Sequence, residues 1–465
     1  MVNIKRINNK QYLNELFEEY SIIIDKCFSN TYLNKKIINF SLLLSITYFF
    51  IRIIDIIFNQ QANLGDEYFF TRDLKYYLEN GYVLSVIKGI SIPFTILSSL
   101  IYYIINDISL SLRLANATIV ILLIIYLLTR DQLIDKSEYK IFIIHLLILI
   151  GTAGGMFFGT NDSFFTASCI IICCEYYLSF KRKKINPIIL TLAFSLCILT
   201  RPHFIIFFPI LFFSALLFLY LKYGMDRIIM KKINLTNFFI GFLIALLFNY
   251  PRIINPQYLT NQAGYLPKFL VLSYSDKSGT YKVDDPKFNW TQWHYYSQMV
   301  ANKNGLGLFA PILPWDEVVK HKLKYGENSL PETYSDYLIN YFPSALKRVP
   351  YSIFEIFIIS IRYVGSLLFL LPLLLISKIK IKNLDASIFI SAIIFSAIIL
   401  WAFIWPRTID PRWLIPFYAI LLIIFANEKN FQPILINKNY MLLNTVLLDF
   451  IILWALWKWR IFLYI

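Results

Sequence analysis

Two adjacent carboxylates, Asp66 and Glu67, follow the first long apolar run, in the stretch "NQQANLGDEYFFTRDLKYYLENG". Ionisable residues at the boundary of an apolar segment are costly, so they favour a functional interpretation. A partly desolvated carboxylate can take a proton from a hydroxyl group and act as a general base. A structural interpretation is also open, in which Asp66 caps the helix that begins "EYFFTRDLKYYLEN".

Further charged residues stand at the ends of later apolar runs. Asp162 lies in "FFGTNDSFFT", Arg201 lies in "LTRPHF", and Arg407 and Arg412 lie in "WPRTIDPRWLIP". Guanidinium groups bind phosphate through paired hydrogen bonds and stabilise charge on a departing phosphate. Acids and arginines together therefore predict group transfer from a lipid phosphate to a hydroxyl acceptor. Structural roles also stay open, namely a helix cap for Asp162 and anchors to lipid headgroups for Arg201 and Arg412.

The composition indicates that these residues belong to a membrane protein. The chain has 465 residues, of which 58% are hydrophobic and 16% are charged, and its net charge is +15. The charges cluster between apolar runs that are long enough to cross a bilayer. Because spanning segments must satisfy their own backbone groups, we expect an all-α polytopic membrane protein. The basic residues then mark cytoplasmic loops, so no nucleic-acid partner is expected.

Hydropathy windows predict about 11 transmembrane helices, in a range of about 10 to 13. The predicted spans are 37–58, 112–129, 141–158, 163–180, 186–200, 204–221, 236–250, 360–377, 385–405, 413–427 and 439–457. The basic segments 130–140, 181–184, 222–232 and 377–382 can all share the cytoplasmic side with the N-terminus only if 92–105 is not a span. We therefore expect 92–105 to lie along the membrane interface.

The predicted topology divides the chain into four parts. Residues 1–36 form a cytoplasmic N-terminal segment, and 37–250 form a transmembrane module whose first outer loop, 59–111, carries the acidic pair. Residues 251–359 form a mixed, mostly helical extracytoplasmic segment that covers the site, and 360–465 form the C-terminal transmembrane helices. The expected location is the cytoplasmic (inner) membrane, with the site facing the periplasm or the extracytoplasmic side.

The cysteines and histidines show neither a disulfide framework nor metal-ligand spacing. Cys173, Cys174 and His145 lie within apolar runs, so we expect them to be core residues. No cofactor and no metal ligand are therefore predicted, and a requirement for a divalent metal stays open.

The order of motifs over residues 1–220 resembles the amino-terminal module of the GT-C membrane glycosyltransferases. The segments that carry the resemblance are "GDEYFFTRDLKYYLENG", "IPFTILSSLIYYI" and "SLRLANATIVILLIIYLLTR". They are similar to the protein O-mannosyltransferase and aminoarabinose-transferase-like group, with its RgtA/B/C/D-type bacterial relatives. The acidic pair, Gly81, Pro93 and Arg113 match this pattern. The family often has a Lys or His beside a Pro-Pro pair, whereas this chain has a single proline there.

The resemblance implies a GT-C fold and a polyprenyl-phosphate sugar donor. It implies that Asp66 is the general base, that Glu67 supports it or binds the acceptor, and that Asp162 orients the acceptor or the sugar. The residues implied to bind the donor phosphate are Arg201 and Arg412, with Lys88 and Arg407 as further ligands. The acceptor is a lipid, a glycan or a protein, and membrane lipids are the remaining partners.

The predicted function is therefore that of a membrane glycosyltransferase that inverts the anomeric carbon, because a single base with in-line attack gives inversion. Two other classes stay open. An en bloc glycan polymerase or ligase would depend on arginines in the large outer segment, where the sequence has only Arg252 and Arg348. A lipid-linked glycan flippase or transporter would need polar residues near the middle of the membrane and two related halves.

Overall fold

The computed structural model describes residues 31–59, 67–201, 204–223, 235–254, 289–303, 313–332, 334–340, 342–380, 385–404, 411–427 and 438–462. All regular elements in these ranges are helices, and none is a strand. The predicted all-α class is thus confirmed for the described part of the chain. Most of the predicted cytoplasmic segment and residues 255–288 of the predicted outer segment lie outside it.

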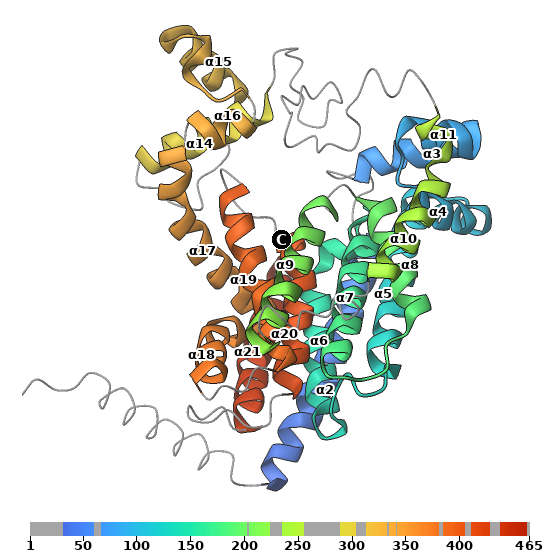
Figure 1. Cartoon of the computed structure of the whole chain (residues 1–465), viewed down its shortest axis with the longest axis vertical. Helices are drawn as coiled ribbons and strands as arrows, with labels where there is room; N and C mark the ends of the chain where they lie inside the picture. Colours follow the sequence, from blue (N-terminus) through green and yellow to red (C-terminus); the bar gives the residue numbers. More distant parts are fainter. Residues whose placement is uncertain are drawn as a thin grey trace, which may run out of the picture.

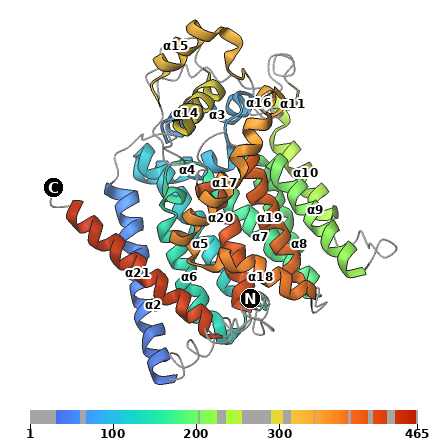
Figure 2. The same cartoon turned by 90° about the vertical axis from the view of Figure 1, so that its left-hand side faces the viewer.

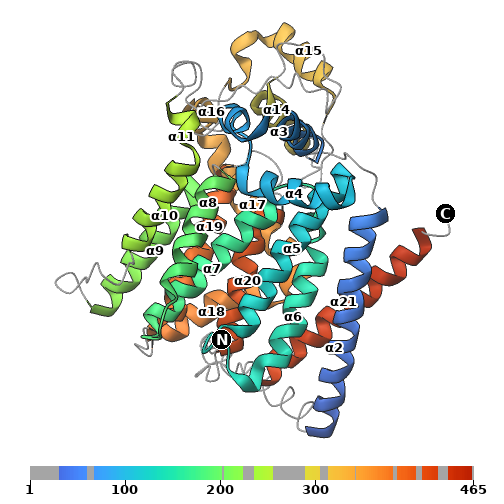
Figure 3. The ribbon, with the colours of Figure 1, turned by 90° about the vertical axis from the view of Figure 1, so that its right-hand side faces the viewer.

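Most helices form a bundle that runs from top to bottom in Figure 1, and most of the others lie at its upper end. The bundle helices are α2 (Thr31–Ile54), α5 (Ile108–Thr129), α6 (Tyr139–Thr152), α7 (Asp162–Phe180), α8 (Pro187–Thr200), α9 (Phe204–Tyr223), α10 (Leu235–Phe248), α17 (Phe342–Val364), α19 (Ala386–Ile404), α20 (Ile415–Asn427) and α21 (Lys438–Phe462). α18 (Leu367–Lys380) lies crosswise near the lower end of the bundle (Figure 3). The helices at the upper end are α3 (Glu67–Lys88), α4 (Ile92–Ile105), α11 (Tyr250–Ile253), α14 (Trp290–Lys303), α15 (Trp315–Tyr325) and α16 (Tyr334–Asn340).

Within the described ranges, four helices are long and apolar enough to cross a membrane by themselves, and a fifth is added if the bent pair α17–α18 counts as one span. The four are Thr31–Asn59, Ile108–Thr129, Asp162–Phe180 and Tyr440–Lys458. Six further apolar helices have only 10–17 residues, which is about 15–26 Å against a hydrocarbon core of about 30 Å. These helices indicate a multi-pass membrane protein. Fewer of the described helices are long enough to span a membrane than the roughly 11 that the hydropathy windows predict.

Among the four long helices, α7 and α2 differ most in burial. In α7, 83% of the apolar window is buried inside the protein, against 22% in α2. Tyr176 and Phe180 of α7 meet Phe389 of α19 at ring-centre distances of 5.9 and 4.8 Å. Since lipid tails are as apolar as these rings, such contacts stabilise the bundle through close van der Waals contact and aromatic geometry. The central α7 therefore gives a fixed support to residues at its ends.

The predicted span 360–377 is not one continuous helix. α17 and α18 meet at an angle of 111°, with a break of two residues between them. Gly365 stands in the break with φ 63°, a left-handed conformation that favours glycine. The chain therefore changes direction inside an apolar run that hydropathy alone presents as uniform.

Polar side chains from distant helices satisfy the backbone at this break. Asn444 of α21 accepts a hydrogen bond from Ser366 N at 2.8 Å and donates one to Val364 O at 3.1 Å. His145 of α6 is fully buried, with its Nε2 3.0 Å from Asn444 Nδ2. Since an apolar surrounding offers no water to these groups, such partners are what makes a break tolerable. The expectation that His145 is a core histidine is confirmed.

α3 and α4 lie across the upper end of the bundle (Figure 3). α3 is kinked at Gly81, whose φ is 73°, so the first stretch of this helix ends near the predicted glycine. α4 covers 92–105 as expected and has 14 residues. Its length and crosswise direction agree with an interfacial helix, and its place at a membrane surface stays a prediction.

The lower end of the bundle joins two of the basic segments. Arg130, just after α5, lies 2.7 Å from Glu175 of α7, and its Nη2 donates to Lys184 O at 2.6 Å. Segments 130–140 and 181–184 therefore lie at the same end, opposite to α3 and α4 (Figure 1). The predicted topology requires this grouping.

Candidate functional site

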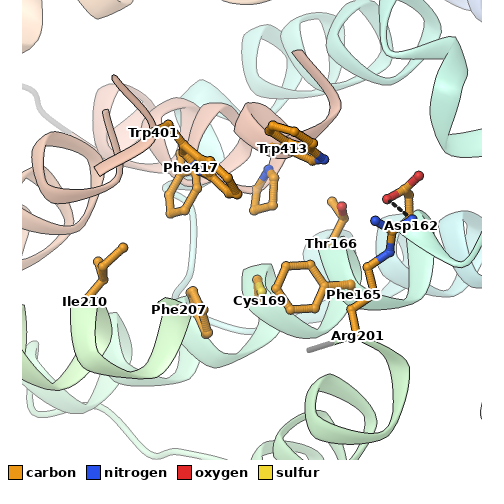
Figure 4. Close-up of a pocket in the computed structure, with 11 residues that line it drawn as sticks. Asp162, Phe165, Thr166, Cys169, Arg201, Phe207, Ile210, Trp401, Trp413 and Phe417 are labelled. Carbon is orange, nitrogen blue, oxygen red and sulfur yellow. Dashed lines mark ion pairs between the residues drawn. The ribbon is translucent and has the colours of Figure 1, made fainter. Parts of the chain in front are cut away.

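The candidate site is built around an ion pair where α8 ends and α7 begins. Asp162 is the first residue of α7, and Arg201 directly follows α8. Arg201 Nη2 lies 2.7 Å from Asp162 Oδ1, and 17% and 9% of the two side chains are exposed. The two residues are 39 positions apart in the sequence, and they meet because α7 begins where α8 ends (Figure 4).

Neighbouring polar groups hold both members of the pair in place. Thr160 Oγ1 donates to Asp162 Oδ2 at 2.8 Å, and Arg201 Nε donates to Asn161 Oδ1 at 2.6 Å. Asn161 Nδ2 in turn donates to Thr200 O at 2.7 Å. Asp162 is itself the first helical residue, and its carboxylate faces Arg201 and Thr160. This geometry differs from the helix cap that was the structural alternative for Asp162.

Aromatic side chains from four helices and a short turn form a small cavity beside the ion pair (Figure 4). The lining includes Phe165, Phe207, Trp401, Trp413 and Phe417. Trp401 and Trp413 stack with their ring centres 4.7 Å apart. The cavity measures about 30 Å³, which is room for about one water molecule. The charged pair therefore borders an almost dry, aromatic surrounding, where its electrostatic interactions are stronger than in water.

The structure describes the backbone of only one of the two C-terminal arginines that the sequence predicts as phosphate ligands. Arg412 lies in the 3₁₀ turn Pro411–Leu414, directly before Trp413 of the cavity wall. Its backbone therefore belongs to the segment that borders the site. Arg407 lies outside the described residues, and so does Asp66 of the first outer loop.

Glu67 is placed in a second, separate ion pair. Its carboxylate meets Arg113 of α5 through two N–H groups at 3.1 Å each, and only 1% of Glu67 is exposed. It also accepts from Gly159 N at 3.2 Å and from the Ser109 hydroxyl. Arg113 Nη1 further donates to Ile56 O and Ile57 O at 3.2 Å. Glu67 thus ties the start of α3 to α5 and to the turn before α7.

The turn between Phe158 and Asp162 links the two ion pairs. Gly159 at its start contacts Glu67, and Thr160 contacts Asp162. Asn116 of α5 donates to Thr160 O at 2.6 Å and accepts from the Ser163 hydroxyl. Sequence reasoning missed this role of Asn116. A buried asparagine in an apolar run does signal an interhelical hydrogen bond, since such a group needs a partner.

Lys88 does not join the candidate site. Its Nζ lies 3.7 Å from the ring centre of Tyr76 on the same helix, and the side chain is exposed. It is not among the residues that line the cavity. Its implied role as a phosphate ligand stays a prediction.

No group of three or more His, Cys, Asp or Glu side chains that could hold a metal ion occurs among the described residues. Cys173 and Cys174 are buried in α7, so the expectation that they are core residues is confirmed. Cys169 of the same helix lines the cavity.

Comparisons with known proteins add no relative: no family model, no curated protein and no solved structure matches the chain. The described structure supports an all-helical protein with several long apolar helices, of a kind expected in membranes.

Proposed function

We propose that this chain is a GT-C type membrane glycosyltransferase with about 11 transmembrane helices. It transfers one sugar from a polyprenyl-phosphate donor to a lipid, glycan or protein acceptor on the extracytoplasmic side of the cytoplasmic membrane. The observation that carries the proposal is the Asp162–Arg201 pair, held by its neighbours beside an aromatic cavity at one end of an apolar bundle.

Arg201 suits the binding of a donor phosphate. A guanidinium group has five N–H donors, more than its contacts with Asp162 and Asn161 use. Because the group is planar and always charged, it can bind phosphate oxygens and stabilise the charge that develops when the phosphate departs. Arg412, in the turn before α20, is the second phosphate ligand of the proposal, and Lys88 and Arg407 are further ones.

The proposed reaction is a single displacement. A hydroxyl oxygen of the acceptor attacks the anomeric carbon, and the bond from that carbon to the phosphate oxygen breaks. The electron pair leaves with the polyprenyl phosphate, and Asp66 takes the hydroxyl proton. One displacement inverts the anomeric configuration. Asp162 orients the acceptor or the sugar, while Glu67 supports the loop that carries Asp66.

Substrate binding requires the aromatic wall to move. A cavity of about 30 Å³ holds only about one water molecule, whereas a sugar phosphate is many times larger. Trp401 and Trp413 therefore separate when the donor enters, and their closure afterwards keeps water from the reacting carbon. The outer segment 251–359, whose helices α14 to α16 lie at the upper end in Figure 1, selects the acceptor.

The test is a transfer assay with the full chain in membranes and a labelled polyprenyl-phosphate sugar. Asp66→Asn should lower the transfer rate by about 10² to 10⁴-fold, the usual contribution of a general base. Asp131→Asn is the matched control, because Asp131 is exposed and follows α5 at the opposite end of the bundle. It should transfer at the wild-type rate.

Three results would contradict the proposal. The first is near-wild-type transfer by Asp66→Asn, which removes the base. The second is transfer of an intact oligosaccharide in one step, which fits a polymerase or ligase. The third is movement of a lipid-linked glycan across proteoliposomes without any glycosidic product, which fits a flippase.

A further inference from the structure

A second cavity lies far from the ion pairs, between α2 and α21. The two helices cross each other obliquely and are in contact at the edge of the bundle (Figures 2 and 3). The groove between them has a volume of about 370 Å³. Its apolar walls include Phe40 of α2 and Phe450 and Leu453 of α21, and its two charged lining residues are Lys36 and Asp449.

The groove opens towards the surroundings of the protein. Only 22% of the apolar window of α2 and 39% of that of α21 are buried, against 83% for the central α7. Phe40 and Phe450 are 56% and 67% exposed. In a membrane protein, exposed phenylalanines on spanning helices face lipid. The occupant of this groove therefore comes from the bilayer.

Asp449 is a buried acid, and only one of its two carboxyl oxygens has a hydrogen-bond partner among the described residues. The residue is 6% exposed, and Ser41 Oγ donates to its Oδ2 at 2.5 Å. Its Oδ1 has no hydrogen-bond partner among the described residues. A carboxyl group in an apolar surrounding avoids its charged form, because a buried charge without a partner is costly. When this carboxyl group is protonated, Oδ2 can accept from Ser41 while Oδ1 donates the proton to an acceptor that a ligand supplies.

Lys36 supplies a cation at the mouth of the groove. Its side chain is exposed, with Nζ 4.5 Å from the ring centre of Tyr32. Lys36 precedes Ser41 by five positions, which is about 7.5 Å along the axis of α2. It lies at the end of α2 that the basic N-terminal segment predicts to be cytoplasmic. A ligand must therefore offer an anion near Lys36 and, deeper in the groove, a hydrogen-bond acceptor.

We propose that this groove binds an anionic glycerophospholipid from the cytoplasmic leaflet. The lipid phosphate contacts Lys36, an ester carbonyl below it accepts the Oδ1 proton of Asp449, and an acyl chain lies along Phe40 and Phe450. In such a lipid the ester carbonyls stand between phosphate and chains, which matches the order of the two groups along α2. A polyprenyl phosphate has no ester carbonyl and would leave the Asp449 proton without a partner.

The test measures lipid binding to the purified full chain in detergent by native mass spectrometry. The probes are phosphatidylglycerol with ester-linked chains, its ether-linked analogue, phosphatidylcholine and a polyprenyl phosphate. Wild-type protein should bind the ester-linked phosphatidylglycerol about fivefold more tightly than the ether-linked one, because the ether has no carbonyl acceptor. It should bind phosphatidylcholine less tightly still.

Substitutions separate the two contacts. Lys36→Gln should weaken phosphatidylglycerol binding about fivefold, whereas Lys35→Gln, an exposed neighbour outside the groove, should not. Asp449→Asn should keep the preference for ester over ether, because the amide can also donate. Asp449→Leu should abolish that preference. An unfolding curve of this variant, measured without added lipid, checks that it is folded.

Several outcomes overturn the inference. Equal binding of ester- and ether-linked lipid removes the role of Asp449, and loss of the preference in Asp449→Asn has the same meaning. Equal binding of phosphatidylcholine removes the requirement for an anion. Tighter binding of the polyprenyl phosphate would assign the groove to a carrier lipid, and a lipid-free dimer would assign it to a second copy of the chain.

Discussion

Two acid–arginine pairs lie at the upper end of the bundle, and they differ in what surrounds them. The Glu67–Arg113 pair is buried, with 1% and 4% of the side chains exposed, and backbone and hydroxyl groups complete its contacts. The Asp162–Arg201 pair is more accessible, at 9% and 17%, and borders a cavity. Both use the same residue types, so residue type alone does not separate a structural pair from a candidate site.

The difference between the pairs concerns the partners that each has in the folded chain. Arg113 is surrounded by the carbonyl oxygens of Ile56 and Ile57 as well as by Glu67, which fixes three segments to one another. Within the described residues, the hydrogen bond and the ion pair of Arg201 go to one segment, the turn that contains Asn161 and Asp162, and aromatic rings lie beside it (Figure 4). A pair of the first kind stabilises the fold, and a pair of the second kind can exchange a partner for a substrate.

Removing the arginine of the buried pair should destabilise the protein more than any other substitution considered below. Arg113→Met should lower the free energy of unfolding by about 3–5 kcal/mol, because Glu67 would be left as a buried charge without its partner. Chemical unfolding of the full chain in detergent measures this change. Lys320→Gln is the control, since Lys320 belongs to an exposed pair with Glu317 and should unfold as wild type does. A stable Arg113→Met protein would show that the buried pair holds nothing together.

The sequence anticipates the Asp162–Arg201 pair better than the Glu67–Arg113 pair. Alternating spans place the ends of two consecutive helices on the same side, so Asp162 and Arg201 could be expected near each other. The partner of Glu67 lies 46 positions away. The sequence did contain a signal for the Glu67–Arg113 pair, because an arginine within "SLSLRLANAT" needs a counter-charge in an apolar surrounding. The pairing itself depends on how α3 folds back on α5, which no local pattern specifies.

The break between α17 and α18 was harder to predict from the sequence than either ion pair. Hydropathy is averaged over a window, so a glycine inside an apolar run leaves the average almost unchanged. The groups that stabilise the break come from Asn444, 78 positions after Ser366, and from His145 on another helix. A prediction of helix continuity fails where distant side chains replace backbone hydrogen bonds.

A substitution in the accessible pair should affect activity more than folding. Under the proposed function, Arg201→Gln should lower the rate of sugar transfer by about 10² to 10³-fold, as the loss of a charge-stabilising donor does in other enzymes. Its unfolding free energy should fall by less than that of Arg113→Met, since Arg201 is more exposed and, among the described residues, is bonded to one segment. Transfer assays and unfolding curves on the same preparations measure both. If Arg201→Gln were inactive and also lost more stability than Arg113→Met, the Asp162–Arg201 pair would be the one that stabilises the fold.

The link between the pairs can be tested at Gly159. A side chain there would place its Cβ 2.6 Å from Glu67 Cγ and 2.9 Å from Glu67 Cδ. Gly159→Ala should therefore lower the unfolding free energy by about 1–3 kcal/mol, the cost of overcrowding a filled site. In the double variant with Glu67→Asp, the shorter acid makes room, so the combined loss should be smaller than the sum of the single losses. Strict additivity would mean that the turn and the buried pair are independent.

A substitution in the aromatic wall should change stability least, and it tests whether the cavity opens when the donor binds. Trp413→Phe reduces the stack on Trp401, so stability should fall by only about 0.5–1.5 kcal/mol. If the donor enters by separating these rings, the weaker stack makes entry easier, and KM for the donor should fall about twofold with kcat little changed. A rise in KM would mean that Trp413 itself contacts the substrate, and the wall would then be a binding surface from the start.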